Sequence, residues 1–170
     1  MNYKLNILAL ALSTAVSAQI GIEKSTIDGS GLLDFPSGTT KGIILPQVQN
    51  AAAMSGTSGG TFVFDGAASK VKFHNGSSWI DLTNAAGVSK ALLPGSEQNR
   101  SKGVIMGAPD SSARGVLILE STDKALILPK VINPAFNVKS PAAGMMCYDP
   151  TAKLVCFYNG TEWSFWGNTD

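Results

Sequence analysis

Three residues in the first half of the chain have the types and the order of a hydrolase triad. Ser58 lies in Gly-Thr-Ser-Gly-Gly (residues 56–60), which satisfies the nucleophile motif G-x-S-x-G, and Asp65 and His74 follow it. That motif needs a turn between a strand and a helix of a large parallel sheet, whereas here a glycine-rich stretch precedes short strand patterns. We therefore predict a loop at Ser58, an exposed strand residue at His74, and no enzymatic site.

The chain has two cysteines, Cys147 and Cys156. If the strands that carry them pair around the turn between them, the two residues oppose each other on the face opposite the aromatic one. Directly opposed residues have Cβ atoms near disulfide reach, and export would permit oxidation. The sequence predicts a cross-strand disulfide. Two free thiols that fill a packed or subunit-facing surface are the alternative, because a register slip of one residue turns a cysteine to the other face.

Aromatic side chains gather near the C-terminus. They are Tyr158, Trp163, Phe165 and Trp166. Such rings could stack on sugar rings, but aromatic residues also dominate small cores, and we expect this second role for the tryptophans. These four residues are the candidates for contact with a glycan or a partner surface.

Composition excludes several other chemistries. The 170 residues include 13 Lys and Arg against 12 Asp and Glu, with one His and two Cys, so the formal net charge is +1. Nucleic-acid binding relies on clustered basic residues, and transition-metal sites rely on several His or Cys ligands. We expect no nucleic-acid partner, no metal and no cofactor.

The first 18 residues have the pattern of a secretory signal peptide. Lys4 precedes an apolar run at residues 5–12, and residues 16–18 offer a cleavage site before Gln19. The run is shorter than the roughly 20 residues that span a bilayer, which argues against a membrane anchor; a buried N-terminal helix is the other alternative. We expect a secreted protein, periplasmic, extracellular or at the cell surface, with no transmembrane segment in the mature chain.

The rest of the chain is a tandem repeat of one sequence unit. The matching blocks are residues 41–48 with 124–131, 60–65 with 144–149, and 71–79 with 155–163. The offset is 83 residues for the first pair and 84 for the other two. The matched residues include Gly, Pro, Asp, Asn-Gly and Trp, which set local structure. The predicted division is a signal peptide at 1–18, repeat unit 1 at 19–82, a linker at 83–103 and repeat unit 2 at 104–170.

Each unit is predicted to be built from short strands. Apolar and polar residues alternate with period 2, and an Asn-Gly pair follows in each unit, where both residues tolerate the positive φ of a hairpin turn. Each unit should end in a three-stranded antiparallel meander, at residues 61–65, 70–74 and 78–82, then 145–149, 154–158 and 162–166. Two short buried strands, at 43–45 and 126–128, should end at Pro46 and Pro129. Residues 49–54 could form a helical turn.

The order of these motifs carries a family resemblance. Gly-Leu-Leu-Asp, then Lys-Gly-Ile-Ile-Leu-Pro, then a strand ending in Phe-Asp or Tyr-Asp, and finally Phe-Tyr-Asn-Gly-x-x-Trp resemble tandem-repeat modules of secreted or cell-surface proteins of Gram-negative bacteria. Those modules are similar to phage tail-fibre and adhesin head segments. The resemblance implies extracellular display and homotrimeric assembly, and it carries no catalytic residues.

Assembly would also answer a physical need. A unit of about 63 residues made of short strands buries little apolar surface, and a meander leaves edge strands that need cover. Three chains that share cores and edges around a three-fold axis would bury more apolar surface and would cover the edge strands. The alternative is a monomer in which unit 1 packs on unit 2. We expect a mainly β, two-repeat protein, intertwined as a homotrimer, with a structural or adhesive function. A carbohydrate-binding protein that uses the aromatic residues of the second repeat is the alternative.

Overall fold

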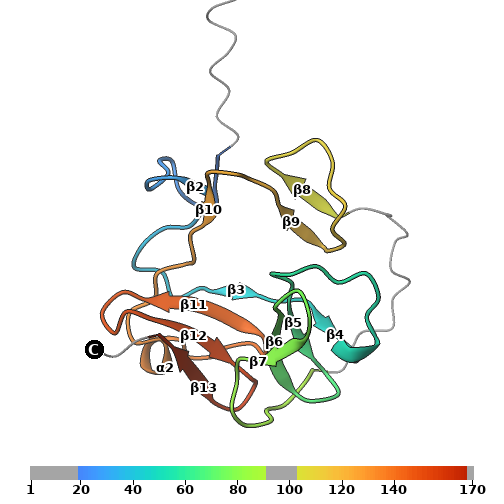
Figure 1. Ribbon diagram of the computed structural model, residues 1–170. Coiled ribbons are helices and arrows are strands. Elements are labelled where there is room, and N and C mark those ends of the chain that lie inside the picture. Colours follow the sequence, from blue (N-terminus) through green and yellow to red (C-terminus); the bar gives the residue numbers. More distant parts are fainter. Residues whose placement is uncertain (1–18, 91–102, 168–170) are drawn as a thin grey trace, which may run out of the picture.

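The structure is a computed structural model that describes residues 19–90 and 103–167, and it is mainly β (Figure 1). The first repeat contains β1 (Ile20–Gly21), β2 (Gly31–Asp34), β3 (Ile43–Ile44), β4 (Gln47–Val48), the 3-10 turn η1 (Ala51–Ala53), β5 (Phe62–Asp65), β6 (Lys70–His74) and β7 (Trp79–Asp81). The second contains β8 (Val104–Met106), β9 (Leu117–Leu119), β10 (Ala125–Leu126), the helical turn α2 (Pro134–Asn137), β11 (Met145–Asp149), β12 (Leu154–Tyr158) and β13 (Trp163–Trp166). The predicted signal peptide and most of the predicted linker lie outside the described residues.

Each repeat ends in a three-stranded antiparallel meander, as the sequence predicts. β5, β6 and β7 form one, and β11, β12 and β13 form the other. The two hairpins pair in equivalent registers, because Phe62 faces Phe73 in the first and Met146 faces Phe157 in the second. The predicted fold class, two tandem β repeats with terminal meanders, is confirmed; intertwining of copies stays a prediction.

An aspartate builds the first turn of each meander. The Oδ1 atom of Asp65 accepts hydrogen bonds from the backbone N–H groups two and three residues on, at 3.0 and 3.4 Å. Asp149 does the same at 2.9 and 3.2 Å. The last turn residue has a positive φ in both copies, 53° at Ser69 and 58° at Lys153. The same side chain thus sets the same turn twice, although the loop residues differ.

The Asn-Gly turns differ in detail from the prediction. Gly76 and Gly160 have φ of 99° and 96°, but neither Asn75 nor Asn159 adopts a positive φ. Instead, each asparagine Oδ1 accepts from the backbone N–H groups two and three residues on, at 2.8 to 2.9 Å. The side chain therefore closes a four-residue turn in which the glycine alone needs the unusual conformation.

The two repeats exchange short strands ahead of their meanders. β3 of the first repeat pairs antiparallel with β11 of the second, and β10 of the second pairs in parallel with β2 of the first. Figure 1 shows the two meanders at one end of the molecule and the small sheets of β1, β2, β10 and of β8, β9 at the other. The predicted strands near Pro46 and Pro129 therefore form, and both connect one repeat to the other. Their predicted burial is wrong, because each lies at the edge of a sheet, where Ile44 is 62% and Leu126 is 38% exposed.

One hydrophobic core spans both repeats. Phe64, Val71 and Leu82 of the first meander pack with Met146 and Phe157 of the second. A smaller cluster lies on the other face of the second meander, around the two cysteines. The two meanders are thus held together by a shared core. In a single repeat, the apolar residues of that core would be exposed to solvent on one side.

Candidate assembly surface

The residues of the hydrolase motif do not come together. The carboxylate of Asp65 is occupied by its own turn and by Lys72, whose Nζ lies 3.1 Å from Oδ2. His74, at the other end of the hairpin, accepts through Nδ1 from the N–H of Gly76 at 3.2 Å. The carbonyl of Ser58 accepts from a threonine hydroxyl in the loop before β5. The side chains of Asp65 and His74 and the carbonyl of Ser58 therefore support local structure, and the three residues do not form a relay.

The predicted exposure of His74 is wrong. The residue is buried, and its ring lies 5.1 Å from that of Trp79 in an edge-on arrangement. The two residues face each other across β6 and β7. The bulky indole of the third strand covers the imidazole, which a strand pattern without known partners does not reveal.

Neither a metal cluster nor a membrane-spanning helix is found in residues 19–90 and 103–167. Within those ranges no three His, Cys, Asp or Glu side chains gather in an arrangement that could hold a metal ion. In the same part of the chain no helix is long and apolar enough to cross a membrane.

The two cysteines lie directly opposite each other, in the predicted register. Cys147 on β11 faces Cys156 on β12, and both are fully buried. The N–H and C=O of Tyr148 bond to the backbone of Pro129 and Val131, so those of Cys147 point toward β12. In such a pair the Cα atoms are about 5.5 Å apart, which suits a disulfide. The two residues are thiols in this structure, so the bridge stays a prediction.

The surroundings of Cys147 hold it as a protonated thiol when the pair is reduced. A hydrogen bond with Cys156 and burial raise the pKa of Cys147. The sulfur of Cys156 lies 3.5 Å from the carbonyl oxygen of Leu154, to which it donates. Val131 and Trp163 close the cluster. The pair is therefore a packing element, shielded from solvent and from reagents in the folded protein.

The C-terminal aromatic residues divide between core and surface. Trp163 is half-buried and packs on Tyr158, with ring centroids 5.3 Å apart. Phe165 and Trp166 are 47% and 43% exposed. The indole N–H of Trp166 donates to the carbonyl of Leu82 in the first repeat. Consecutive residues of a strand point to opposite faces, so Phe165 and Trp166 do not form one flat platform.

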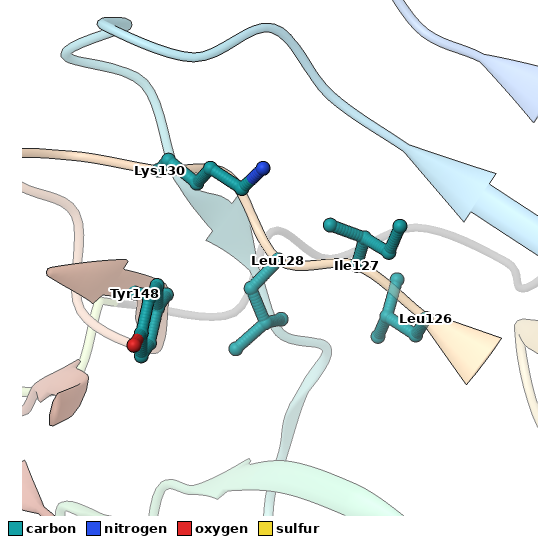
Figure 2. Close-up of a pocket in the computed structure, with 5 residues that line it drawn as sticks. All are labelled: Leu126, Ile127, Leu128, Lys130 and Tyr148. Atoms are coloured by element: carbon teal, nitrogen blue, oxygen red, sulfur yellow. The ribbon is translucent and has the colours of Figure 1, made fainter. Parts of the chain in front are cut away.

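Several exposed apolar side chains mark strand edges. Phe62 at the start of β5, Ile44 on β3 and Leu126 on β10 are all exposed, as are Val116 and Leu117 at β9. A shallow pocket of about 340 Å³ follows the edge of β10, lined by Leu126, Ile127, Leu128, Lys130 and Tyr148 (Figure 2). Apolar edges of this kind are the usual places where another chain adds a strand.

A comparison with known families shows to which family the chain belongs. A family model described as the phage tail like trimerisation region matches the chain twice, over residues 21–99 and 103–169. The chain belongs to this family. No curated protein and no solved structure matches it. The two matched segments follow the two repeats, so the chain carries two consecutive copies of the phage tail-like trimerisation region.

In this trimerisation region an ion network fastens the repeats to each other. The buried carboxylate of Asp34 accepts from Nζ of Lys24 at 2.6 Å and from two backbone N–H groups at 2.8 Å. Burial acts to raise the pKa of Asp34, but these bonds outweigh it and lower the pKa. Asp28 binds Lys24 as well, and it also binds Lys130 of the second repeat at 3.0 Å. The network thus fixes the segment that leads into β2 and joins it to the segment that follows β10.

The strand exchange between the repeats could not be predicted from the sequence. A short apolar run before Leu-Pro predicts a strand, but it does not say which strand will be its partner. A signal was present: the run occurs in both repeats, as Ile43 to Leu45 and Leu126 to Leu128, and two copies of a strand with no partner in their own meander point to pairing elsewhere.

Proposed function

We propose that this chain is a secreted structural or adhesive protein without enzymatic activity, which acts as a homotrimer through its surface contacts. The family points to a structural role in a trimeric, fibre-like assembly. Beyond what the family indicates, we propose that the protein is exported, that the trimer consists of three copies of this chain, and that it functions in adhesion or surface structure.

The observation that carries the proposal is the match of the trimerisation family to both repeats. The physical chemistry of the edges supports it. Phe62, Ile44 and Leu126 expose large apolar side chains at strand ends, and a strand edge in this state favours pairing with another chain. Export is supported by the signal-peptide pattern of residues 1–18.

Export can be tested on the full chain expressed in a Gram-negative host. The expected result is a protein outside the inner membrane whose mature N-terminus is Gln19. A protein that keeps residues 1–18 and stays in the cytoplasm would contradict the secreted location. A variant with Leu8→Arg, which places a charge in the apolar run, should remain uncleaved and serves as the control.

Carbohydrate binding is the second candidate function. It is favoured by the exposure of Phe165 and Trp166 on the last strand. The bond from Trp166 to Leu82 and the opposite directions of the two rings favour a role in protein contacts instead. A glycan array separates the two: we expect no glycan bound by the native trimer. Specific binding that is lost in Phe165→Ala or Trp166→Ala, with the fold intact, would establish the lectin function.

A further inference from the structure

The contact between the two repeats has a direction. Repeat 1 gives β3 to the meander of repeat 2, and repeat 2 gives β10 to β2 of repeat 1. If the two repeats were related by a two-fold axis, each pairing would occur a second time between the matching strands. β10 would then also pair with β5, and β3 would also pair with β9. Within the described residues β5 pairs with β4 and β6, and β9 pairs with β8. The contact is therefore head-to-tail: within the described residues, repeat 2 does not make the equivalent contact with repeat 1.

The strands that a second contact of the same kind would use still have free edges. On β5, Phe62 pairs with β6 on one side, and no described strand pairs with it on the other side. Its counterpart in the second repeat, Met146, pairs there with Ile43 of β3. The residue that matches Ile43 is Leu126, at offset 83. Phe62 and Leu126 are 36% and 38% exposed, so both partners of the missing pair are apolar and accessible.

Two matched glycines locate the same gap. Gly144 and Gly60 precede their meanders with φ of 83° and 86°. A Cβ on Gly144 would lie 3.2 Å from the Cβ of Phe64 and 3.4 Å from the carbonyl oxygen of Leu45, because repeat 1 packs against it. A Cβ on Gly60 would meet nothing within 4 Å. Gly60 thus has the backbone conformation of Gly144, but the space on its Cβ side is empty in the described chain.

The shallow pocket is the other half of this contact. Its five lining residues, Leu126, Ile127, Leu128, Lys130 and Tyr148, match by offset the residues Ile43, Ile44, Leu45, Gln47 and Phe64 of the first repeat. In the first repeat Gly144 lies against Leu45 and Phe64, and the start of β11 pairs with the backbone of β3. Figure 2 shows Leu126, Ile127 and Leu128 along one extended segment, with Tyr148 on the side of Leu128. The residues that match Gly144 and the start of β11 are 60–62 of the first repeat, at offset 84.

We propose that β5 of a second copy of this chain pairs antiparallel with the free edge of β10, with Phe62 of one copy opposite Leu126 of the other. The start of β5 fills the pocket, and Gly60 lies against Leu128 and Tyr148. On the other side, β3 of the second copy lies parallel to the free edge of β9, with Ile43 beside Leu117. The contact repeats between copies what repeat 1 does to repeat 2 within one chain.

This contact is head-to-tail, so each copy gives one edge and receives another, and it closes into a ring when the rotation permits. Three chains of two repeats would then form a ring of six similar units. The inference rests on the proposed homotrimer and specifies which strands hold it together. It also explains why the apolar edges come in complementary pairs.

Directional cross-linking tests the contact. Two versions of the mature chain, one with Leu126→Cys and one with Phe62→Cys, are produced with different tags, mixed during refolding and oxidised. Opposed strand residues lie within disulfide range, so we expect a covalent dimer that contains one of each version. Either version oxidised alone should give no dimer, and the doubly substituted chain should give a covalent trimer.

The matched control replaces Leu126→Cys by Ile132→Cys, an aliphatic residue that is 52% exposed and lies outside the pocket. It should not cross-link to Phe62→Cys. Dimers formed by a single version, or equal cross-linking of the control, would overturn the directional contact. Light scattering on the same samples separates this inference from the proposed function: a trimer without the expected cross-link refutes the contact alone, and a monomer refutes both.

A second variant gives a readout that does not depend on oxidation. Leu126→Glu places a charge on the proposed edge at a site exposed in the single chain, so the chain should fold, as its circular dichroism would show, and yet fail to form trimers. Ile132→Glu should leave the trimer intact. A full trimer with Leu126→Glu would overturn the proposed pairing.

Discussion

At the scale of single residues, the two meanders have the same backbone fold but carry different side chains on the matching face. Where the second repeat has Leu154, Cys156 and Phe165 on one face of its meander, the first has Lys70, Lys72 and Asp81 at the matching positions. In the first repeat, Asp81 forms ion pairs with Lys70 at 2.8 Å and with Lys72 at 3.5 Å. The hydrogen bond from Lys70 lowers the pKa of Asp81 despite its partial burial. The same register thus carries a solvated face in one copy and an apolar face in the other.

The cysteine pair gives a prediction for the oxidised protein. After export, Cys147 and Cys156 should be bridged, because they oppose each other at disulfide distance in an oxidising compartment. Alkylation in denaturant without reductant should add no mass, and prior reduction should allow two labels. Reduction should lower the free energy of unfolding by about 2–3 kcal/mol for a loop of this length. Two labels without reduction would show that the thiols stay free.

The buried carboxylate of Asp34 gives a prediction for stability. Asp34→Asn should lower the free energy of unfolding by about 1–3 kcal/mol at pH 7, because the charged bond from Lys24 is lost in a buried site. Since the folded pKa of Asp34 lies below its ordinary value of about 3.9, its contribution is complete above that pH and is lost as the pH falls through the folded pKa. The difference between variant and native protein in urea titrations should therefore shrink in acid.

The matched control for Asp34 is Glu23→Gln. Glu23 pairs with Lys41 at 2.7 Å, but both side chains are more than half exposed, so the pair should contribute less than about 1 kcal/mol. An equal loss in both variants, or a loss for Asp34→Asn that does not depend on pH, would contradict the role of the buried network.

At the scale of elements, the meanders could be predicted from the sequence and the strand exchange could not. The strands at residues 70–74, 145–149 and 154–158 are observed as predicted, and the others agree within a residue or two, because alternation and turn residues are local signals. The positions of β3 and β10 follow from the apolar runs before Pro46 and Pro129, but their partners depend on packing across repeats. The burial of His74 was missed for the same reason, since Trp79 covers it from the next strand.

The two Asn-Gly turns give a prediction for this scale. Gly160→Ala and Gly76→Ala share the cost of a positive φ, about 1–2 kcal/mol. A Cβ on Gly160 would also lie 2.2 Å from the carbonyl oxygen of Val88, whereas one on Gly76 would meet nothing within 4 Å. Gly160→Ala should therefore be the more destabilising by at least about 1 kcal/mol in urea unfolding. Equal losses would show that the segment at Val88 does not pack on the second turn.

At the scale of the whole molecule, the shared core and the directed contact are the structural basis of the homotrimer that we propose. Phe64 of the first meander and Phe157 of the second are buried in one cluster, so the two repeats satisfy each other on one side. On the other side, Phe62 and Leu126 remain exposed at complementary edges. A molecule that ends in one free donor edge and one free acceptor edge is complete only in a closed assembly.

The central claim, a homotrimer of this chain, is tested most directly by the molar mass of the mature protein in solution. Light scattering coupled to size exclusion, with the chain mass taken from denaturing mass spectrometry, should give a single species of three chain masses over a range of concentrations. A stable folded species of one chain mass would contradict the account.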